Sequence, residues 1–232
     1  MALLDNPMSD EPSKKMRAYL AEIYRLSEKK SSPDTFIATS ELAEVLFVTA
    51  PAVNRMVNRL KEQGLLEHEP YRGIRLTPAG QKEALLQLRN HRIIEAFLVN
   101  VMGFQWDEVF DEALNMSQTL SPELAQRMLE MAGNPRYCPH GEPIPSPEGQ
   151  LEDMHDINLA EVEAGRKGVI TRCITREVDR LQYMAALGLY PGTECQILHI
   201  APFNGPIQIK VGNEYRIIGH TLAESMRIRL ED

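Results

Sequence analysis

Two side chains that often bind metal ions, His91 and Glu95, stand four residues apart in the segment HRIIEAFLVNVMGFQWDEVFDEALNMSQ, residues 91–118. On a helix, residues four apart share one face, so this imidazole and this carboxylate would point the same way. A second acidic stretch follows at 107–112, but where further ligands would be expected the chain has Leu114, Ser117 and Gln118. The segment therefore has the pattern of a metal site without a full set of ligands.

A second pair of possible ligands, Cys138 and His140, lies in YCPHGEPIP, residues 137–145. Pro139 separates the two, and the flanking proline and glycine residues are typical of an irregular loop. No second Cys–His pair completes a tetrahedral zinc site. We therefore interpret this segment as a structural loop.

The composition bounds the class of protein. A chain of 232 residues has room for two or three small domains, each with its own core. No run approaches 18 uninterrupted apolar residues, so we expect no membrane association, and the N-terminal residues lack the pattern of a secretory signal. Three widely spaced cysteines, Cys138, Cys173 and Cys195, favour a reducing compartment. We therefore expect a cytoplasmic protein.

The acidic side chains are concentrated in the middle of the chain. Residues 91–157 hold 3 Lys or Arg against 12 Asp or Glu, whereas 1–90 hold 13 against 12. Acidic side chains in that middle segment could hold a cation, although a solvated helix face would have the same composition.

The segment 39–80 indicates a different chemistry. Its pattern predicts two short helices separated by FVT, then two short strands around a turn at Arg72 and Gly73. Two helices followed by a β-hairpin are typical of a winged helix-turn-helix. This motif places its second helix in the major groove of DNA. We predict DNA contacts from polar and basic residues of the helices and the hairpin: Ser40, Thr49, Pro51, Asn54, Arg55, Asn58, Arg59, Arg72 and Arg75. The alternative is a solvated helix with ordinary surface charges.

The rest of the chain predicts a helical segment and a β segment. Residues 79–102, 106–116 and 122–131 predict three helices, whose apolar residues need a partner surface, with a monomeric helical core as the alternative. Alternating strands towards the C-terminus predict a small β-barrel. We thus expect an α+β fold: a flexible arm (1–15), a winged helix-turn-helix DNA-binding domain (16–86), a helical dimerisation and metal-site domain (87–148), a linker (149–157) and a β-barrel domain (158–232).

Several motifs together resemble the diphtheria-toxin-repressor family, whose manganese transport regulators have a similar hairpin. The motifs YLAEIYRL, SELAEVLFVTAPAVNRMVNRLKEQGLL, YRGIRLTPAG, HRIIEAFL, WDEVFDEA and GEPIP occur in the order seen in that family. The C-terminal strands resemble the FeoA-like domain that ends many family members. The resemblance implies a homodimeric, metal-activated repressor of metal-uptake genes that binds double-stranded operator DNA.

The resemblance also implies which residues would bind metal. His91 and Glu95 match two ligands of the family's ancillary site, but the next ligand, usually His, is Phe110. The primary-site positions fall on side chains with little or no affinity for a divalent ion: Ala18, Leu114, Ser117 and Gln118. We therefore expect a degenerate primary metal site.

Two further positions of the ancillary site come from the C-terminal domain of the family and fall on Glu177 and Arg180. Glu177 could complete a set with His91 and Glu95 for one Mn²⁺, Fe²⁺ or Zn²⁺ per chain. Arg180 is a permanent cation, which could instead pair with Glu95 in a metal-free network of salt bridges. Both alternatives, one metal or none, remain open from the sequence.

We predict from these patterns a sequence-specific transcription regulator. An enzyme is not expected, because the chain has no nucleophile elbow, P-loop or two-cysteine zinc pattern. The alternative is a metal carrier or iron-transport accessory protein built on the FeoA-like barrel. A basic recognition helix argues against that alternative, because a carrier has no need of one.

Overall fold

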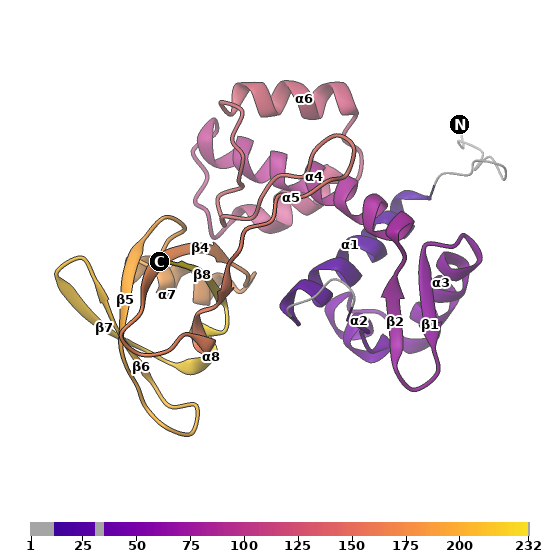
Figure 1. Ribbon diagram of the computed structural model, residues 1–232. Helices are drawn as coiled ribbons and strands as arrows, with labels where there is room; N and C mark the ends of the chain where they lie inside the picture. The colour runs from indigo at the N-terminus through magenta and orange to yellow at the C-terminus, as the bar shows by residue number, and fades with distance from the viewer. Residues whose placement is uncertain (1–11, 31–34, 232) are drawn as a thin grey trace. The chain divides into compact units, whose positions relative to one another are not determined.

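A computed structural model describes residues 12–30 and 35–231 (Figure 1). The chain forms two compact units. The N-terminal unit runs to Arg89 and includes Pro145–Gln150, and the C-terminal unit contains Asn90–Ile144 and the residues from Leu151 onwards. Most of the expected flexible arm, 1–11, lies outside the described residues. No helix in the described part of the chain has the length and apolar character needed to cross a membrane.

The N-terminal unit contains the two short helices and the hairpin expected from residues 39–80, preceded by one longer helix. Helix α1 (Lys14–Lys29) is followed by α2 (Thr39–Val45), α3 (Ala50–Glu62), β1 (Leu66–Glu69) and β2 (Gly73–Leu76). The two strands pair in antiparallel fashion from Leu66–Leu76 to Glu69–Gly73. Gly73 has φ +109°, and a Cβ there would lie 2.2 Å from the Ile37 carbonyl oxygen. The close approach of this hairpin to residue 37 therefore requires glycine.

Helix α4 (Pro78–Asn100) continues from the first unit into the second, where it packs with two shorter helices. These are α5 (Val109–Ser117) and α6 (Pro122–Met131), and Ser121 begins α6 by accepting a hydrogen bond from the Leu124 amide. Apolar side chains from all three helices form one buried cluster: Ile93, Ile94, Leu98, Val109, Ala113, Ala125 and Met128. The C-terminal half of α4, which carries His91 and Glu95, therefore packs against α5 and α6.

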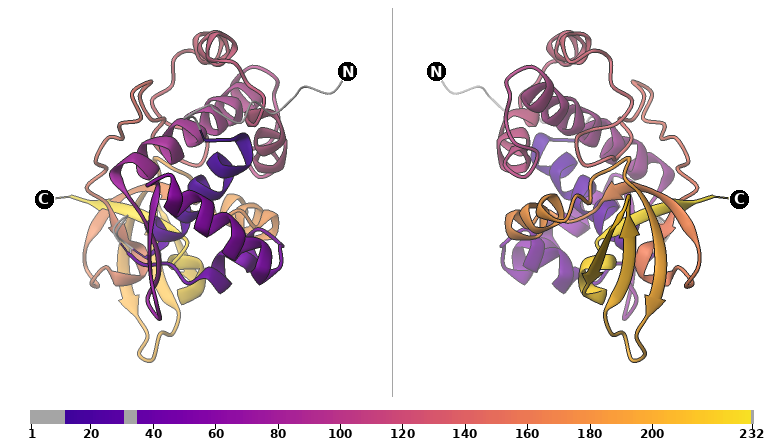
Figure 2. Two further views of the ribbon diagram at one scale, coloured as in Figure 1. Left: turned by 90° about the vertical axis from the view of Figure 1, so that its right-hand side faces the viewer. Right: turned by 90° about the vertical axis from the view of Figure 1, so that its left-hand side faces the viewer.

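The C-terminal segment forms a six-stranded sheet, which can be followed in Figure 2. Its strands run in the spatial order β3-β8-β4-β5-β6-β7. They are β3 (Ile157–Asn158), β4 (Lys167–Cys173), β5 (Glu194–Ile200), β6 (Ile207–Val211), β7 (Glu214–Ile218) and β8 (Met226–Leu230). Short helical segments interrupt them: η1 (Leu159–Glu161), α7 (Val178–Ala186) and α8 (His220–Ala223).

The expected β-barrel is wrong, because this sheet is open and its edge strands β3 and β7 do not pair with each other. Strand β3 is two residues long and pairs only with β8, so it offers little ladder for closure. The apolar face is covered instead by helical residues that join the buried core: Leu159 from η1, Leu181 and Met184 from α7, and Leu222 from α8. A sheet covered in this way buries its core without closing.

Candidate metal centre and nucleic-acid interface

Helix α4 brings His91 and Glu95 together as their spacing predicted. The His91 Nε2 atom lies 3.1 Å from the Glu95 Oε1 atom, and both residues are only 2% exposed. A carboxylate this deeply buried requires partners that compensate for its lost hydration.

The 137–143 loop adds two side chains to this pair. The His140 Nδ1 atom lies 3.3 Å from Glu95 Oε1, and the Cys138 Sγ atom lies 4.0 Å from His140 Nδ1. Within the described ranges, Glu95, Cys138 and His140 are the one group of three or more potential ligands whose atoms converge, all within 4.8 Å of one another. Our interpretation of YCPHGEPIP as a purely structural loop missed this Glu95–Cys138–His140 cluster.

Backbone contacts with β4 and the side chain of Arg92 hold the 137–143 loop in place. The carbonyl oxygen of His140 accepts a hydrogen bond from the Cys173 amide of β4, with an N–O distance of 2.9 Å. Gly141 has φ +83°, and a Cβ there would lie 1.9 Å from the Thr171 carbonyl oxygen. On the other side, Arg92 of α4 pairs with Glu142 at 2.8 Å and donates to the Pro143 carbonyl at 2.9 Å. The side chains of Cys138 and His140 are therefore held between α4 and β4.

The hydrogen bonds of His140 indicate that a proton or a metal ion lies between its Nδ1 atom and the Glu95 carboxylate. Its Nε2 atom lies 2.8 Å from the Trp106 carbonyl oxygen, which can only accept, so Nε2 carries a hydrogen. In a neutral ring, the lone pair of Nδ1 would then face the Glu95 carboxylate. A proton shared by Nδ1 and the carboxylate, or a metal ion, resolves that conflict. A metal-binding histidine commonly donates its other ring N–H to a backbone carbonyl, as His140 does.

The pKa directions agree with this geometry. Burial raises the pKa of the Glu95 carboxyl, but His91 and His140 outweigh burial and hold that pKa well below its usual range. Burial lowers the pKa of His140, but Glu95 outweighs it and the pKa is raised. The pKa of the Cys138 thiol is raised well above its usual value by burial and then by Glu95 and Glu142. A metal ion bound here would therefore displace protons from Cys138 and His140.

The cluster fits a transition-metal ion. A tetrahedral ion with bonds of about 2.0 to 2.3 Å places its ligand atoms roughly 3.3 to 3.8 Å apart. The His140–Glu95 separation of 3.3 Å lies in that range, and the Cys138–His140 separation of 4.0 Å lies slightly above it. Nitrogen, carboxylate oxygen and thiolate sulphur together suit Zn²⁺ or Fe²⁺ better than Mn²⁺, because thiolate is a soft ligand.

The sequence-predicted partners Glu177 and Arg180 lie elsewhere. The Arg180 Nε atom is 2.7 Å from the Glu177 carboxylate, and the same guanidinium lies 3.2 Å from the Ser225 hydroxyl. The alternative pairing of Arg180 with Glu95 is therefore not formed, because Glu177, three residues earlier, pairs with Arg180. Glu177 is exposed and does not belong to the Glu95–Cys138–His140 cluster.

Phe110 fills the position where the resemblance implies a histidine ligand. Its ring centroid lies 4.7 Å from that of His91, and the Arg176 guanidinium lies 4.5 Å above it. An aromatic ring thus packs against His91 where a ligand would otherwise stand.

The primary-site positions do not form a ligand set. Ser117 is buried on α5, and its hydroxyl donates to the carbonyl of Leu114 in its own helix at 3.0 Å. Gln118 is exposed, and Leu114 and Ala18 are partly buried. These four side chains do not fit a divalent ion.

Helix α3 carries the predicted DNA-contacting side chains on one exposed face. Its apolar residues Val53, Met56, Val57 and Leu60 are buried. The polar and basic residues on the other side are exposed: Asn54, Arg55, Asn58 and Arg59, together with Thr49 and Pro51 at the start of the helix and Ser40 in α2. This division leaves a row of hydrogen-bond donors facing outward.

The hairpin arginines have protein partners as well. Arg72 pairs with Glu69 and Arg75 with Glu67, each at 2.5 Å, and both guanidinium groups lie within 4.9 Å of the Phe36 ring centroid. Ion pairs this exposed contribute little, so a phosphate group could compete for either arginine.

Two exposed aromatic residues near this face were not predicted from the sequence. Tyr71 is fully exposed at the tip of the hairpin with φ +67°, and Phe47 is 95% exposed with φ +51° between α2 and α3. Bulky residues rarely adopt such a conformation. The position of Tyr71 directly before the predicted turn at Arg72 and Gly73 was the available signal, because turn apices are exposed.

Three family models match consecutive parts of this chain. Residues 12–74 match the model of the iron-dependent repressor N-terminal DNA-binding domain. Residues 77–146 match the metal-binding and dimerisation domain of the same family, and 157–230 match the FeoA domain. The iron-dependent repressor IdeR of Mycobacterium tuberculosis is 28% identical, over 90% of this chain and 94% of its own.

Solved structures of metal-dependent regulators have a similar fold. A manganese-dependent transcriptional repressor in complex with manganese has a TM-score of 0.83 at 28% identity, covering 93% of this chain and all of its own. The manganese regulator SloR has a TM-score of 0.78 at 30% identity, covering 95% of this chain and all of its own. Transcriptional repressors are not a class of enzymes. The outward-facing α3 and the metal-ligand cluster thus lie in a chain that belongs to the iron-dependent repressor family of metal-dependent transcriptional repressors.

Proposed function

We propose that this chain represses transcription as a homodimer that binds a specific double-stranded operator. In this proposal α2, α3 and the β1–β2 hairpin form a winged helix-turn-helix within 16–86, residues 87–148 dimerise and hold the metal, and 158–232 form the FeoA-like domain after a linker at 149–157. The observation that carries the proposal is the exposed face of α3, where Asn54, Arg55, Asn58 and Arg59 stand opposite a fully apolar face. Amide and guanidinium groups are suited to hydrogen bonding with base edges.

Replacing Arg55 with Ala tests this assignment. Arg55 lies in the first half of α3, the half that reaches base edges in this motif. We expect Arg55→Ala to weaken operator binding by about 1–3 kcal/mol and to reduce the preference for operator over random DNA, as loss of a bidentate base contact does. Competition binding with fluorescent operator at fixed salt measures both effects.

Arg72→Ala and Arg127→Ala serve as controls. Arg72, in the hairpin, should weaken operator and random DNA alike and flatten the salt dependence, because phosphate contacts carry no sequence information. Arg127, exposed on α6, should change neither. Unchanged operator preference in Arg55→Ala would show that another face of the unit reads the bases.

We infer dimerisation from apolar side chains that remain exposed on and beside the helices of 87–148. They include Val101, Met102, Phe104, Met116, Leu124 and Met131. Burying such side chains against a second copy would be favourable without any ion. Light scattering at micromolar concentration should give twice the chain mass of 26.3 kDa, with or without EDTA. A monomer under both conditions would contradict the proposed dimer.

We further propose that Glu95, Cys138 and His140 hold one metal ion per chain, with His91 bonded to Glu95 from the neighbouring turn of α4. The ion would supply the positive charge that the cluster requires and would tie the 137–143 loop to α4. Because Ala18, Leu114, Ser117 and Gln118 cannot bind a second ion, we expect the response of DNA binding to metal to be weak. We also propose that this repressor acts in the cytoplasm.

A further inference from the structure

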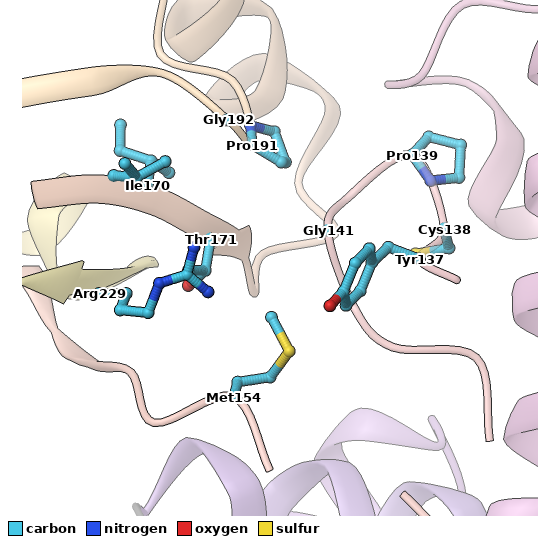
Figure 3. Close-up of a pocket in the computed structure, with 11 residues that line it drawn as sticks. Tyr137, Cys138, Pro139, Gly141, Met154, Ile170, Thr171, Pro191, Gly192 and Arg229 are labelled. Atoms are coloured by element: carbon cyan, nitrogen blue, oxygen red, sulfur yellow. The ribbon is translucent and has the colours of Figure 1, made fainter. Parts of the chain in front are cut away.

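A pocket of about 410 Å³ lies beside the 137–143 loop, within the C-terminal unit (Figure 3). Its walls come from that loop, from β4, from the turn at Pro191 and Gly192, and from β8. The volume falls in the range of about 300 to 1,000 Å³ that is usual for small-molecule sites. Nothing in the operator-binding function uses this pocket.

The lining combines an apolar body with a single charge. Met154, Ile170 and Pro191 supply much of the apolar wall, and Arg229 is the one charged side chain among the lining residues. Figure 3 shows Arg229, Thr171, Met154 and Tyr137 arranged around the same space. No Asp or Glu lines it. The pocket therefore favours an anionic group on an otherwise apolar molecule.

The charges around the pocket leave Arg229 available. The nearby carboxylate of Asp156 is taken by Arg172, at 2.7 Å, and by the Thr171 hydroxyl, at 2.6 Å. None of the carboxylates in the described ranges forms an ion pair with Arg229, which extends from β8 beside Val169 of β4. An unneutralised guanidinium at the edge of an apolar pocket is suited to a carboxylate, which it can bind in a bidentate manner.

The walls are preformed by backbone contacts. Gly141 lies so close to β4 that any side chain there would collide with the Thr171 carbonyl and with Pro191. The Gly192 amide donates to the Ile170 carbonyl at 2.7 Å, which fixes the opposite turn to the same strand. A ligand would therefore enter a shaped site without first ordering its walls.

We propose that this pocket binds a small organic carboxylate with an apolar body. The carboxylate pairs with Arg229, and the apolar part lies against Met154, Ile170 and Pro191. Inorganic phosphate is disfavoured because most of the wall offers it no hydrogen bonds. Cys138 also lines the pocket, so a bound acid contacts the loop that carries the Glu95–Cys138–His140 cluster. On the basis of the proposed metal centre, the acid and the metal should then alter each other's affinity by the same factor.

The test uses the full chain labelled with ¹³C at the methionine methyl groups, in EDTA and without DNA. The probe is 4-phenylbutyrate, and the matched neutral probe is 4-phenyl-1-butanol. We expect saturable movement of the Met154 methyl signal, identified by its loss in Met154→Leu, with no movement for the core residues Met184 and Met226. Arg229→Gln should weaken phenylbutyrate binding about tenfold or more, because a charge-assisted hydrogen bond is lost.

Three comparisons decide the outcome. Arg216→Gln, on strand β7 away from the pocket, should leave binding unchanged. Equal binding of the neutral alcohol, equal competition by inorganic phosphate, or no effect of Arg229→Gln would each overturn the proposal, as would the absence of a saturable shift. Because metal and DNA are both absent, such a failure would leave the proposed operator and metal sites standing.

Discussion

Replacing Glu95 with Gln should abolish tight binding of a divalent metal by this repressor. The substitution keeps the size of the side chain but removes the carboxylate that lies 3.1 Å from His91 and 3.3 Å from His140. A neutral amide is a poor ligand for a transition metal, and it no longer offsets the positive charge of the ion. We expect the affinity for Zn²⁺ to fall by more than about 100-fold, beyond the 10- to 100-fold typical of losing a group that only supports a ligand.

The controls separate the observed cluster from the ligand set that the sequence suggested. Cys138→Ser should weaken binding strongly, whereas Glu177→Gln should leave it unchanged, because Glu177 is paired with Arg180. His91→Ala should weaken binding by about 10- to 100-fold, since the Glu95 carboxylate then loses a supporting partner. Isothermal titration of each full-length variant measures these differences. Loss of binding in Glu177→Gln together with normal binding in Cys138→Ser would restore the sequence-based set and contradict the cluster.

Replacing Arg92 with Ala should destabilise the C-terminal unit by about 3 kcal/mol, the lower end of the cost of removing one partner from a buried ion pair. Arg92 is fully buried, and its guanidinium bonds to both the Glu142 carboxylate and the Pro143 carbonyl. Without it these acceptors lose their charged donor, and a cavity remains beside α4. Urea unfolding monitored by the fluorescence of Trp106, the one tryptophan in the chain, measures the loss.

An exposed arginine in the same unit provides the control. Arg127 pairs with Glu130 on the surface of α6, so Arg127→Ala should change the free energy of unfolding by no more than about 0.5 kcal/mol. A loss below about 1 kcal/mol for Arg92→Ala would mean that the 137–143 loop is held by its contacts with β4 alone. In that case Arg92 would not be needed to position Cys138 and His140.

Local patterns predicted the parts of this chain that depend on local physics. The apolar period of α3 and the Gly73 turn predicted the two helices and the hairpin, and the four-residue spacing predicted the contact between His91 and Glu95. Such features arise within a few residues, where helical period and turn chemistry decide the outcome.

The predictions that failed concern features that depend on contacts between segments far apart in the sequence. Cys138 and His140 reach Glu95 across more than forty residues, through a loop fixed by Arg92 and by the amide of Cys173. No periodicity encodes such a contact. The open sheet was missed for a related reason: η1, α7 and α8 cover its apolar face, and strand patterns alone cannot reveal whether helices or further strands will do so.

We propose that this repressor has one metal site of altered composition and lacks the other. A metal ion shifts a protein between conformations only by binding one of them more tightly. With Ala18, Leu114, Ser117 and Gln118 in the primary positions, that difference in affinity should be close to zero there. One cluster, Glu95–Cys138–His140, remains in the described chain.

The most direct measurement is a calorimetric titration of the metal-free full-length protein with Zn²⁺, Fe²⁺ and Mn²⁺, paired with operator affinity at saturating metal and in EDTA. We expect one site per chain, filled more tightly by Zn²⁺ or Fe²⁺ than by Mn²⁺, and a change in operator affinity of less than tenfold, about 1.4 kcal/mol. Two tight sites per chain, or a hundredfold activation of operator binding by metal, would contradict this proposal.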